Sequence, residues 1–295
     1  RRPGSAREAN VPKVMGIVNV TPDSFSDGGL FVDPERAIEH GKEIAAEGAA
    51  ILDIGGESTR PGADPVPADV ELERTQPVVQ ALCAEDGPGV PVSIDTSKAP
   101  AAAAALDAGA AIVNDVTALR GDPELAGLCA ERGCEVILMH MLGEPRTMQD
   151  NPVYDDVVDD IKAFLAERIE FAVGAGIAEE RISIDPGIGF GKTLRHNLEL
   201  LHRLGEFRSL GRPIVIGTSR KRFIGALTGR EVGERVGGTI ASNVLALAAG
   251  ADVFRVHDVR ETVEALSTAE AILARRPWRD TFTRSKRTTT TTPRP

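Results

Sequence analysis

The sequence predicts an α/β fold in which eight parallel strands close into a (β/α)8 barrel. Three observations lead to this prediction. Short apolar runs rich in β-branched residues alternate eight times with longer stretches of helical period. The short runs are apolar at nearly every position, which is typical of parallel strands buried on both faces. Eight such units are also the number that closes a barrel of this kind.

The units follow one another in order along the chain. The expected strands cover residues 14–20, 50–56, 91–96, 111–116, 135–140, 181–186, 213–218 and 253–258. The expected helices follow them at 34–48, 67–85, 98–109, 122–133, 153–175, 193–204, 221–249 and 260–275, the seventh broken around 229–238. Glycine before several strands, as in EGAAILDI, supplies helix C-caps. A doubly wound open sheet is the alternative, but the sequence shows neither a glycine fingerprint nor an edge-strand break.

The length and composition suit one large core. The chain has 295 residues, of which 42% are hydrophobic, and we assign a single domain to residues 11–278. The first ten residues lack a starting Met, which suits a processed or trimmed end, and residues 280–295 are low-complexity, polar and basic. Both ends, 1–10 and 280–295, are expected to be disordered.

The overall charge narrows the choice of partners. A formal net charge of −10 argues against a general nucleic-acid surface and against a basic membrane-binding face. No apolar run reaches the ~18–20 residues of a membrane span, and no signal-peptide pattern opens the chain. The three cysteines lack CxxC spacing, which fits reduced thiols. We therefore expect a cytoplasmic protein that acts on small molecules.

Polar side chains stand at the carboxyl end of every expected strand. In chain order they are Asn19, Glu57 with Ser58, Asp95, Asn114, His140, Asp185, Ser219 with Lys221, and Arg255 with His257. A barrel brings these ends to one face, where the active sites of this fold are built. One such residue usually only turns out to solvent, but eight strand ends together predict an enzyme site.

One part of this ring offers hydrogen-bond acceptors. Asp95, Asn114 and Asp185 supply carboxylates and an amide. These groups suit the edge of a polar heterocycle that is rich in N–H donors.

The rest of the ring suits negative charge. Arg255 and His257 are two residues apart on one strand, so they point the same way and fit an anion. Together with Asn19 and Asp27 they can frame a divalent metal that holds a phosphate. Ser219, at an expected helix start, predicts a second anion site.

At these positions the sequence resembles the dihydropteroate synthases. The motifs that carry the resemblance, over roughly residues 13–275, are GIVNVTPDSFSDGG, DIGGESTRPG, SIDT, NDV, DPGIGFGK, GTSRKRF and RVHDV. The resemblance implies a TIM barrel that joins 6-hydroxymethyl-7,8-dihydropterin pyrophosphate to p-aminobenzoate and releases pyrophosphate in folate biosynthesis. It also implies Mg²⁺ as cofactor, a homodimer and inhibition by sulfonamides.

The resemblance also implies a role for each site residue. The pterin would be held by Asp95, Asn114, Asp185 and Lys221. The pyrophosphate would be held by Asn19, Arg255 and His257, with Asn19 as the protein ligand of Mg²⁺. The p-aminobenzoate would lie against Phe25, Thr59, Pro61, Phe190 and Ser219. The expected catalytic residues are Lys221 and two loop residues that would close over the reacting atoms, Asp27 and Arg60.

The implied chemistry is electrophilic. Departure of pyrophosphate would leave a methylene with cation character on the electron-rich pterin, which suits a weak aniline nucleophile. The glycine-rich end of GIVNVTPDSFSDGG is expected to be a lid that excludes water. One alternative is a pterin-dependent methyltransferase barrel, which has no use for both STRPG and SRKRF. The other is a non-catalytic paralogue, which would be expected to lose Asp27, Arg60, Ser219 or Lys221.

Overall fold

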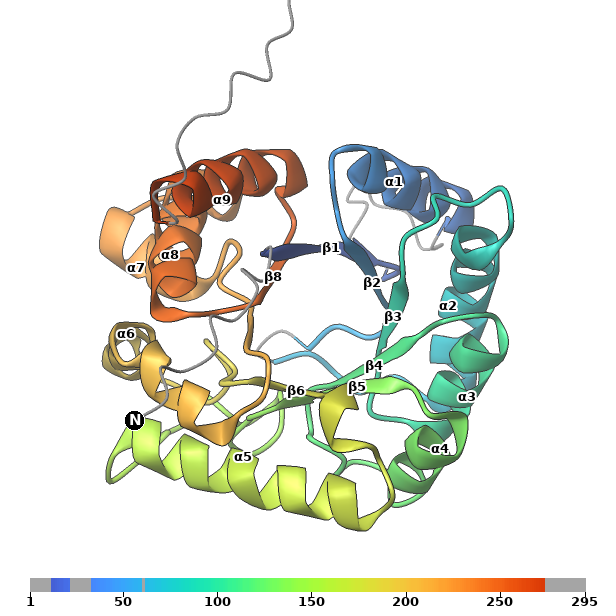
Figure 1. Ribbon diagram of the computed structural model, residues 1–295, viewed down its shortest axis with the longest axis horizontal. Helices are drawn as coiled ribbons and strands as arrows, with labels where there is room; N and C mark the ends of the chain where they lie inside the picture. Colours follow the sequence, from blue (N-terminus) through green and yellow to red (C-terminus); the bar gives the residue numbers. More distant parts are fainter. Residues whose placement is uncertain (1–11, 22–32, 60–61, 274–295) are drawn as a thin grey trace, which may run out of the picture.

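Eight parallel strands form one sheet that curls into the expected barrel, and helices surround it on the outside (Figure 1). The computed structural model describes residues 12–21, 33–59 and 62–273. The predicted domain boundaries, and the disorder expected at both chain ends, concern residues outside these ranges.

The strands follow the predicted order. They are β1 (Lys13–Asn19), β2 (Ile51–Gly55), β3 (Val92–Asp95), β4 (Ile112–Asp115), β5 (Glu135–Met139), β6 (Ile182–Asp185), β7 (Val215–Ile216) and β8 (Val253–Val256). Their order in the sheet is β6-β5-β4-β3-β2-β1-β8-β7. A parallel bridge between Ile184 and Ile214 joins β6 to β7, so the two ends of the sheet meet.

The seventh strand is shorter than the predicted span 213–218. β7 keeps only two residues in the ladder. The backbone N–H of Ile214 donates to the carboxylate of Asp252 at 2.9 Å, and the hydroxyl of Thr218 donates to the side chain of Asn243 at 2.8 Å. Before β7 a side chain thus takes the place of one backbone partner, and after β7 the side chain of Thr218 is bonded to α8.

The helices that link the strands are α1 (Pro34–Ala46), α2 (Ala68–Cys83), α3 (Ala99–Asp107), α4 (Leu125–Arg132), α5 (Val157–Gly174), α6 (Leu194–His202), α7 (Arg222–Thr228), α8 (Val236–Ala249) and α9 (Val259–Leu273). The separation of α7 from α8 confirms the predicted break. α5 begins later than predicted because Asp156 is its N-cap and accepts from the N–H groups of Val158 and Asp159. Gly250 ends α8 in the left-handed conformation, as its position before a strand predicted. In the described part of the chain, no helix has both the length and the apolar character that crossing a membrane requires.

The inside of the barrel changes from apolar to polar along the strands, where every second residue points inward. The lower inward residues pack as one buried cluster: Met15, Ile51, Ile112, Ile137, Val215 and Val253. At the carboxyl ends the register sets Asn19 beside Gly55, Gly55 beside Asp95, and Asp95 beside Asn114. A larger apolar cluster fills the space between the strands and the helices. The barrel therefore has an apolar floor beneath a polar mouth.

The loop between β6 and α6 depends on glycine. Gly187 has a φ of 69°, and a Cβ atom there would lie 1.9 Å from the carbonyl oxygen of His140. Gly187→Ala should therefore lower the free energy of unfolding by about 2–4 kcal/mol, because a clash is added to a left-handed backbone. In Gly127→Ala, within α4, the new Cβ atom meets nothing within 4 Å, so stability should rise by about 0.5–1 kcal/mol. Urea unfolding of both variants tests this, and equal effects would contradict it.

Candidate active site

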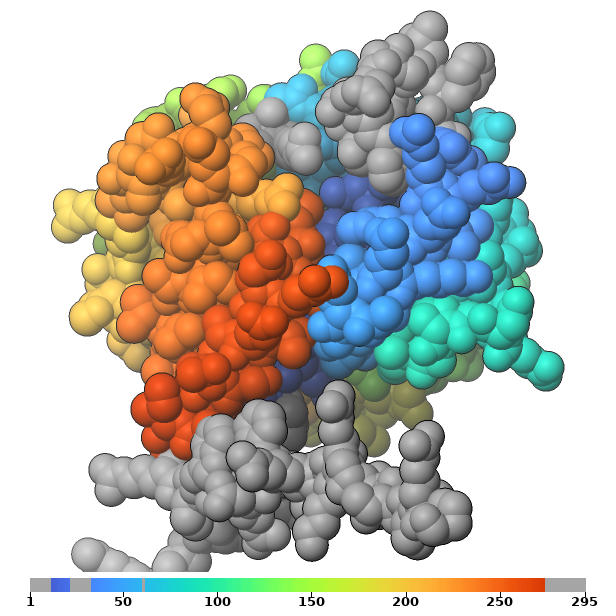
Figure 2. Space-filling view, turned by 90° about the horizontal axis from the view of Figure 1, so that it is seen from above, coloured from blue at the N-terminus to red at the C-terminus, as the bar shows by residue number. Residues whose placement is uncertain are grey.

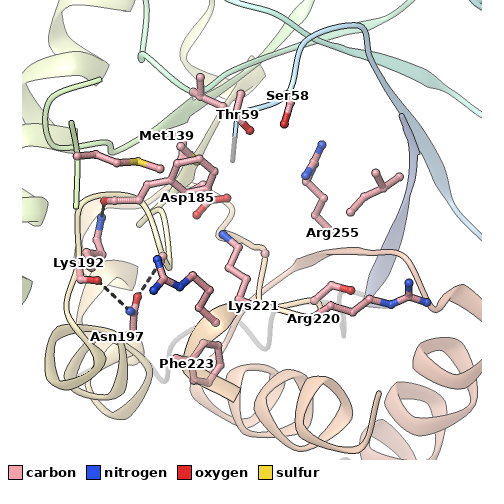
Figure 3. Close-up of a pocket in the computed structure, with 18 of the residues that line it drawn as sticks. Ser58, Thr59, Met139, Asp185, Lys192, Asn197, Arg220, Lys221, Phe223 and Arg255 are labelled. Carbon is pink, nitrogen blue, oxygen red and sulfur yellow. Dashed lines mark hydrogen bonds between the residues drawn. The ribbon is translucent and has the colours of Figure 1, made fainter. Parts of the chain in front are cut away.

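A cavity of about 830 Å³ opens at the polar mouth of the barrel (Figure 3). Its lining includes every predicted site residue that falls in the described chain: Asn19, Thr59, Asp95, Asn114, Asp185, Phe190, Ser219, Lys221, Arg255 and His257. Met139, at the end of β5, was not predicted and also lines the cavity. The remaining predicted site residues, Phe25, Asp27, Arg60 and Pro61, lie outside the described residues.

Arg255 is held between two carboxylates inside the barrel. Its Nε donates to Oδ2 of Asp53 at 2.6 Å, and its Nη2 donates to Oδ2 of Asp95 at 2.7 Å. The amide nitrogen of Asn114 donates to the same Asp53 oxygen at 3.1 Å. The sequence placed Arg255 with the anion ligands, whereas the structure joins it to the acceptor edge of the site. Arg255 therefore lies at the border between the two parts of the cavity.

The buried charges of the site shift one another's protonation. Burial raises the pKa of Asp95 to about 7; the charge of Arg255 opposes this rise and the charge of Asp53 adds to it. Burial also raises the pKa of Asp185, while the positive charge of Lys221 lowers it by a smaller amount. Conversely, burial lowers the pKa of Lys221 to about 8, although the negative charge of Asp185 acts to raise it. The carboxyl groups and the cations are thus coupled across the cavity.

Side chains hold the β6–α6 loop in one conformation. Four successive carbonyls accept hydrogen bonds from different side chains: Ile188 from Lys221 Nζ, Gly189 from Gln149 Nε2 at 2.7 Å, Phe190 from Lys192 Nζ at 2.9 Å, and Gly191 from the Tyr154 hydroxyl at 2.8 Å. The Nζ of Lys221 also lies 4.3 Å from the centroid of the Phe190 ring. The loop therefore presents Phe190 as a fixed aromatic wall of the cavity.

Lys192 is a buried amine behind this wall. Its side chain lines the cavity, and its Nζ lies 3.0 Å from Nδ1 of His140. Burial lowers the pKa of His140 to about 2, so the imidazole is neutral and its Nδ1 accepts from Lys192. Burial also lowers the pKa of Lys192 well below its usual value. His140, one of the polar residues at the predicted strand ends, thus supports the loop through Lys192.

The loop after β7, the start of α7 and the residue before α8 give the cavity a basic side. Arg220, Arg222 and Arg235 line it next to Lys221. Arg220 has a left-handed backbone with a φ of 56°, and its Nε donates to Asp258 at 3.1 Å. The Nη1 of Arg235 donates to the carbonyl of Arg220 at 3.0 Å. In a chain with a net charge of −10, this local group of cations suits an anion.

The two predicted anion sites touch each other. The Oγ of Ser219 lies 2.9 Å from Nδ1 of His257, and it accepts the backbone N–H of His257 at 3.1 Å. Ser219 was predicted for p-aminobenzoate and His257 for pyrophosphate. The cavity therefore offers one basic region with two adjoining parts, next to a separate acceptor edge.

Comparison with known proteins shows the family of this chain. The model of the pterin binding enzyme family matches residues 15–257. The chain belongs to this family. The dihydropteroate synthase of Escherichia coli strain K12 is 45% identical over 271 residues, which cover 92% of this chain and 95% of the relative. A probable bifunctional folylpolyglutamate synthase/dihydropteroate synthase of Haloferax volcanii is 49% identical over 258 residues, and this chain spans only 30% of its length.

Solved structures agree with the sequence comparison. The Yersinia pestis dihydropteroate synthase in a sulfonamide drug complex matches with a TM-score of 0.85 and 46% identity, covering 89% of this chain and 94% of that chain. The Xanthomonas albilineans dihydropteroate synthase in complex with 7,8-dihydropteroate matches with a TM-score of 0.80 and 47% identity, with coverage of 89% and 94%. The chain is thus placed among the dihydropteroate synthases, transferases of folate biosynthesis, as its motifs predicted. The methyltransferase alternative has no support among these relatives.

Besides Met139 and the arginines of the basic side, two further residues of the site were not predicted. Asp53 is an inward residue of β2, two positions before Gly55, and a carboxylate within an otherwise apolar strand was the available signal. Lys192 closes the quoted motif DPGIGFGK, where a lysine directly after three closely spaced glycines was the signal. Asp53 contacts other site residues without lining the cavity, and Lys192 lies in the loop beyond a strand end, so a search of the strand ends passed over both.

Asp95 should make the stability of the protein depend on pH. Its folded pKa of about 7 exceeds the ~3.9 of an unfolded aspartate, so the folded state binds more protons between these values. The stability associated with the protonated carboxyl is full below about pH 4 and is lost as the pH rises through about 7. Asp95→Asn removes this loss and leaves Arg255 paired with Asp53.

Urea unfolding measures this effect. From about pH 4.5 to about pH 8, the difference in unfolding free energy between Asp95→Asn and the wild type should move by about 1–3 kcal/mol in favour of the variant. Asp86→Asn, at an exposed position, is the control for general effects of charge. A difference that stays constant with pH would show that Asp95 does not titrate in this range.

Proposed function

We propose that this cavity condenses 6-hydroxymethyl-7,8-dihydropterin pyrophosphate with p-aminobenzoate through a cation-like pterin methylene, giving 7,8-dihydropteroate and pyrophosphate. One observation carries the proposal: a single cavity joins a buried acceptor edge to a basic region, with Arg255 at the border between them. This division matches a substrate whose heterocycle donates N–H groups and whose other end is a pyrophosphate.

The pterin ring would bind by its N–H edge. Asp95 and Asp185 are 8% and 6% exposed, and their carboxylates accept hydrogen bonds from ring and amino N–H groups. Asn114 adds an amide oxygen. Lys221 would donate to an acceptor atom of the ring. Its Nζ, which donates to Ile188 in this structure, has a flexible stem that allows it to reach the ring instead.

The pyrophosphate would leave toward Asn19, Arg255 and His257. The bond between the methylene carbon and its oxygen breaks, and both electrons go to the departing pyrophosphate. Positive charge at Arg255 stabilises that group as its charge grows. The electron-rich pterin spreads the positive charge left on the methylene.

The described residues fit a Mg²⁺ ion that takes most of its ligands from the substrate. Asn19 brings an amide oxygen to the cavity. Among the residues the structure describes, no group of three or more His, Cys, Asp or Glu side chains could hold a metal by itself. Such a sparse site suits Mg²⁺, which keeps waters and binds phosphate oxygens. When bound, the ion would supply positive charge to the leaving pyrophosphate.

The p-aminobenzoate would lie against Phe190 and Thr59, with its carboxylate toward Ser219 and the arginines beside it. Its aniline nitrogen supplies the electron pair of the new C–N bond, and one proton then passes from nitrogen to water. A cationic carbon needs no strong base to assist a weak nucleophile. Closure of the loops that carry Asp27 and Arg60 remains our prediction for how water is kept from the methylene.

We further propose that the chain works in the cytoplasm as a homodimer. All three cysteines are free thiols, which suits a reducing compartment. Exposed apolar side chains occur on α7, on the short 3-10 helix η3 (Val232–Glu234) and on α8: Leu227, Val232, Val236 and Leu245. Figure 2 shows α9, in red, on the outer surface between α1, in blue, and the orange elements that include α8. Leu245 is exposed on α8 outside the cavity lining, where an apolar side chain suits contact with a second copy.

A pyrophosphate-release assay tests the proposed reaction. Release should require both substrates, stop on removal of Mg²⁺ with a chelator, and resume when Mg²⁺ is restored. Asp185→Ala should lower kcat/KM by about 10–100-fold, because a charged hydrogen bond to the pterin is lost. Glu199→Ala, at a site outside the cavity lining, should leave the rate unchanged. Release at the full rate without p-aminobenzoate would show that the methylene is captured by water instead.

Sedimentation tests the proposed dimer. The wild type should sediment at twice the chain mass of 31.2 kDa. Leu245 is 68% exposed on α8, so Leu245→Glu should favour the monomer by placing a charge in the apolar contact. Val153, also 68% exposed but in the loop before α5, supplies the matched control Val153→Glu. A wild type that stays monomeric at micromolar concentration would refute the dimer.

A further inference from the structure

Asp53 is a buried carboxylate beneath the site. It is an inward residue of β2 between Ile51, which belongs to the apolar floor, and Gly55 at the mouth. Its exposure is 0%, and it does not line the cavity. A charge in such a position is costly unless it is paired. Asp53 therefore calls for an explanation that direct ligand binding does not supply.

One oxygen of Asp53 serves two residues of the site. Its Oδ2 accepts from Nε of Arg255 at 2.6 Å and from the amide nitrogen of Asn114 at 3.1 Å. Its Oδ1 is buried and has no hydrogen-bond partner among the described residues. The three side chains come from β2, β4 and β8, so a single carboxylate connects strands from different parts of the barrel.

The contact with Asn114 decides which end of its amide faces the ligand. A carboxylate only accepts hydrogen bonds, so the nitrogen of Asn114 must point to Asp53. The amide oxygen is then the end left for the cavity. Asn114 becomes an acceptor beside Asp95 and Asp185, which suits a ring edge made of N–H donors.

The contact with Arg255 restrains the cation. Arg255 donates from Nε to Asp53 and from Nη2 to Asp95. These two carboxylates therefore compete with any anion for its guanidinium group. Removing the charge of Asp53 would leave Arg255 less neutralised. Arg255 would then attract an anion more strongly, while Asn114 would lose its fixed orientation.

We propose that Asp53 is a positioning residue that favours binding of the pterin ring at the expense of pyrophosphate affinity. It does so by orienting Asn114 as an acceptor and by holding Arg255 at the border of the two subsites. The inference rests on the proposed roles of Asn114 and Arg255, and it adds a residue that touches neither part of the substrate. It also predicts opposite effects on two ligands, which general damage to the fold would not produce.

The test uses Asp53→Asn and calorimetry with two separate probes, 6-hydroxymethylpterin and inorganic pyrophosphate with Mg²⁺. The variant keeps the shape of the side chain and removes its charge. Affinity for the pterin should fall about tenfold or more, since one charge-assisted contact no longer orients Asn114. Affinity for pyrophosphate should stay equal or rise. A loss of both affinities by the same factor, or no change in either, would overturn the proposal.

Asp115→Asn is the matched control. Asp115 is also a fully buried carboxylate at a strand end, but it accepts from the backbone N–H groups of Thr117 at 2.8 Å and Leu119 at 2.6 Å, away from the cavity lining. This variant should lower stability and leave the ratio of the two affinities as in the wild type. A change of that ratio as large as in Asp53→Asn would attribute the effect to loss of any buried charge and would refute the assignment.

If Asp53→Asn folds poorly, a second variant tests the same proposal. Asp53→Ala leaves a space in which added formate can replace the carboxylate, and formate should restore pterin affinity there. Formate should leave the pterin affinity of Asp115→Ala unchanged. Absence of rescue in a folded Asp53→Ala would count against the proposal. If the wild type itself fails to bind 6-hydroxymethylpterin, the proposed function fails, which is a different outcome from an unchanged Asp53→Asn.

Discussion

The parallel sheet of this protein closes on itself, and this closure fixes both the core and the site. Once eight strands meet in a ring, every second residue must point into a narrow interior, and the register decides its height. The sequence meets this constraint with Met15, Ile51 and their partners at the bottom and with polar residues at the top. The same geometry that packs the core therefore assembles the site.

The charged groups inside the barrel share partners. Asp53 and Asp95 share Arg255, while Lys221 and Lys192 lie near Asp185. In a low-dielectric setting no such group is independent, because each carboxyl raises its neighbour's pKa and each cation lowers it. A substrate that brings N–H donors and a pyrophosphate would enter this network by exchanging partners with it. Binding of such a substrate would therefore change the protonation of these groups.

Different hydrogen bonds hold the two described loops at the mouth of the barrel. The β6–α6 loop is held by side chains at four successive carbonyls, so Phe190 stands ready as a wall. The β7–α7 loop is held from α8, where Thr239 accepts the N–H of Arg220 at 3.0 Å and Arg235 binds its carbonyl. Preorganisation of this kind spares the ligand the cost of ordering the pocket. It also explains why the strained φ of Arg220 persists.

The fold class and the strand-end residues that meet in the cavity could be predicted from the sequence alone. Eight apolar runs of strand length, separated by helical stretches, predict a closed parallel barrel, and strand ends in a barrel share one face. That reasoning brought Asn19, Asp95, Asn114 and Asp185 to a single cavity, as the structure confirms. The seventh strand was predicted, but its shortness was not, because the N–H of Ile214 bonds to the side chain of Asp252, which local pattern does not reveal.

The contacts that support the site could not be predicted in this way. Asp53 and Arg255 are 202 positions apart in the chain, and Lys192 reaches His140 across 52, so neither pair has a signature within one motif. Orientation of an amide, sharing of a cation and burial of an amine depend on which atoms meet in space. Periodicity shows which way a side chain points, whereas its partners follow from the packing of the whole barrel.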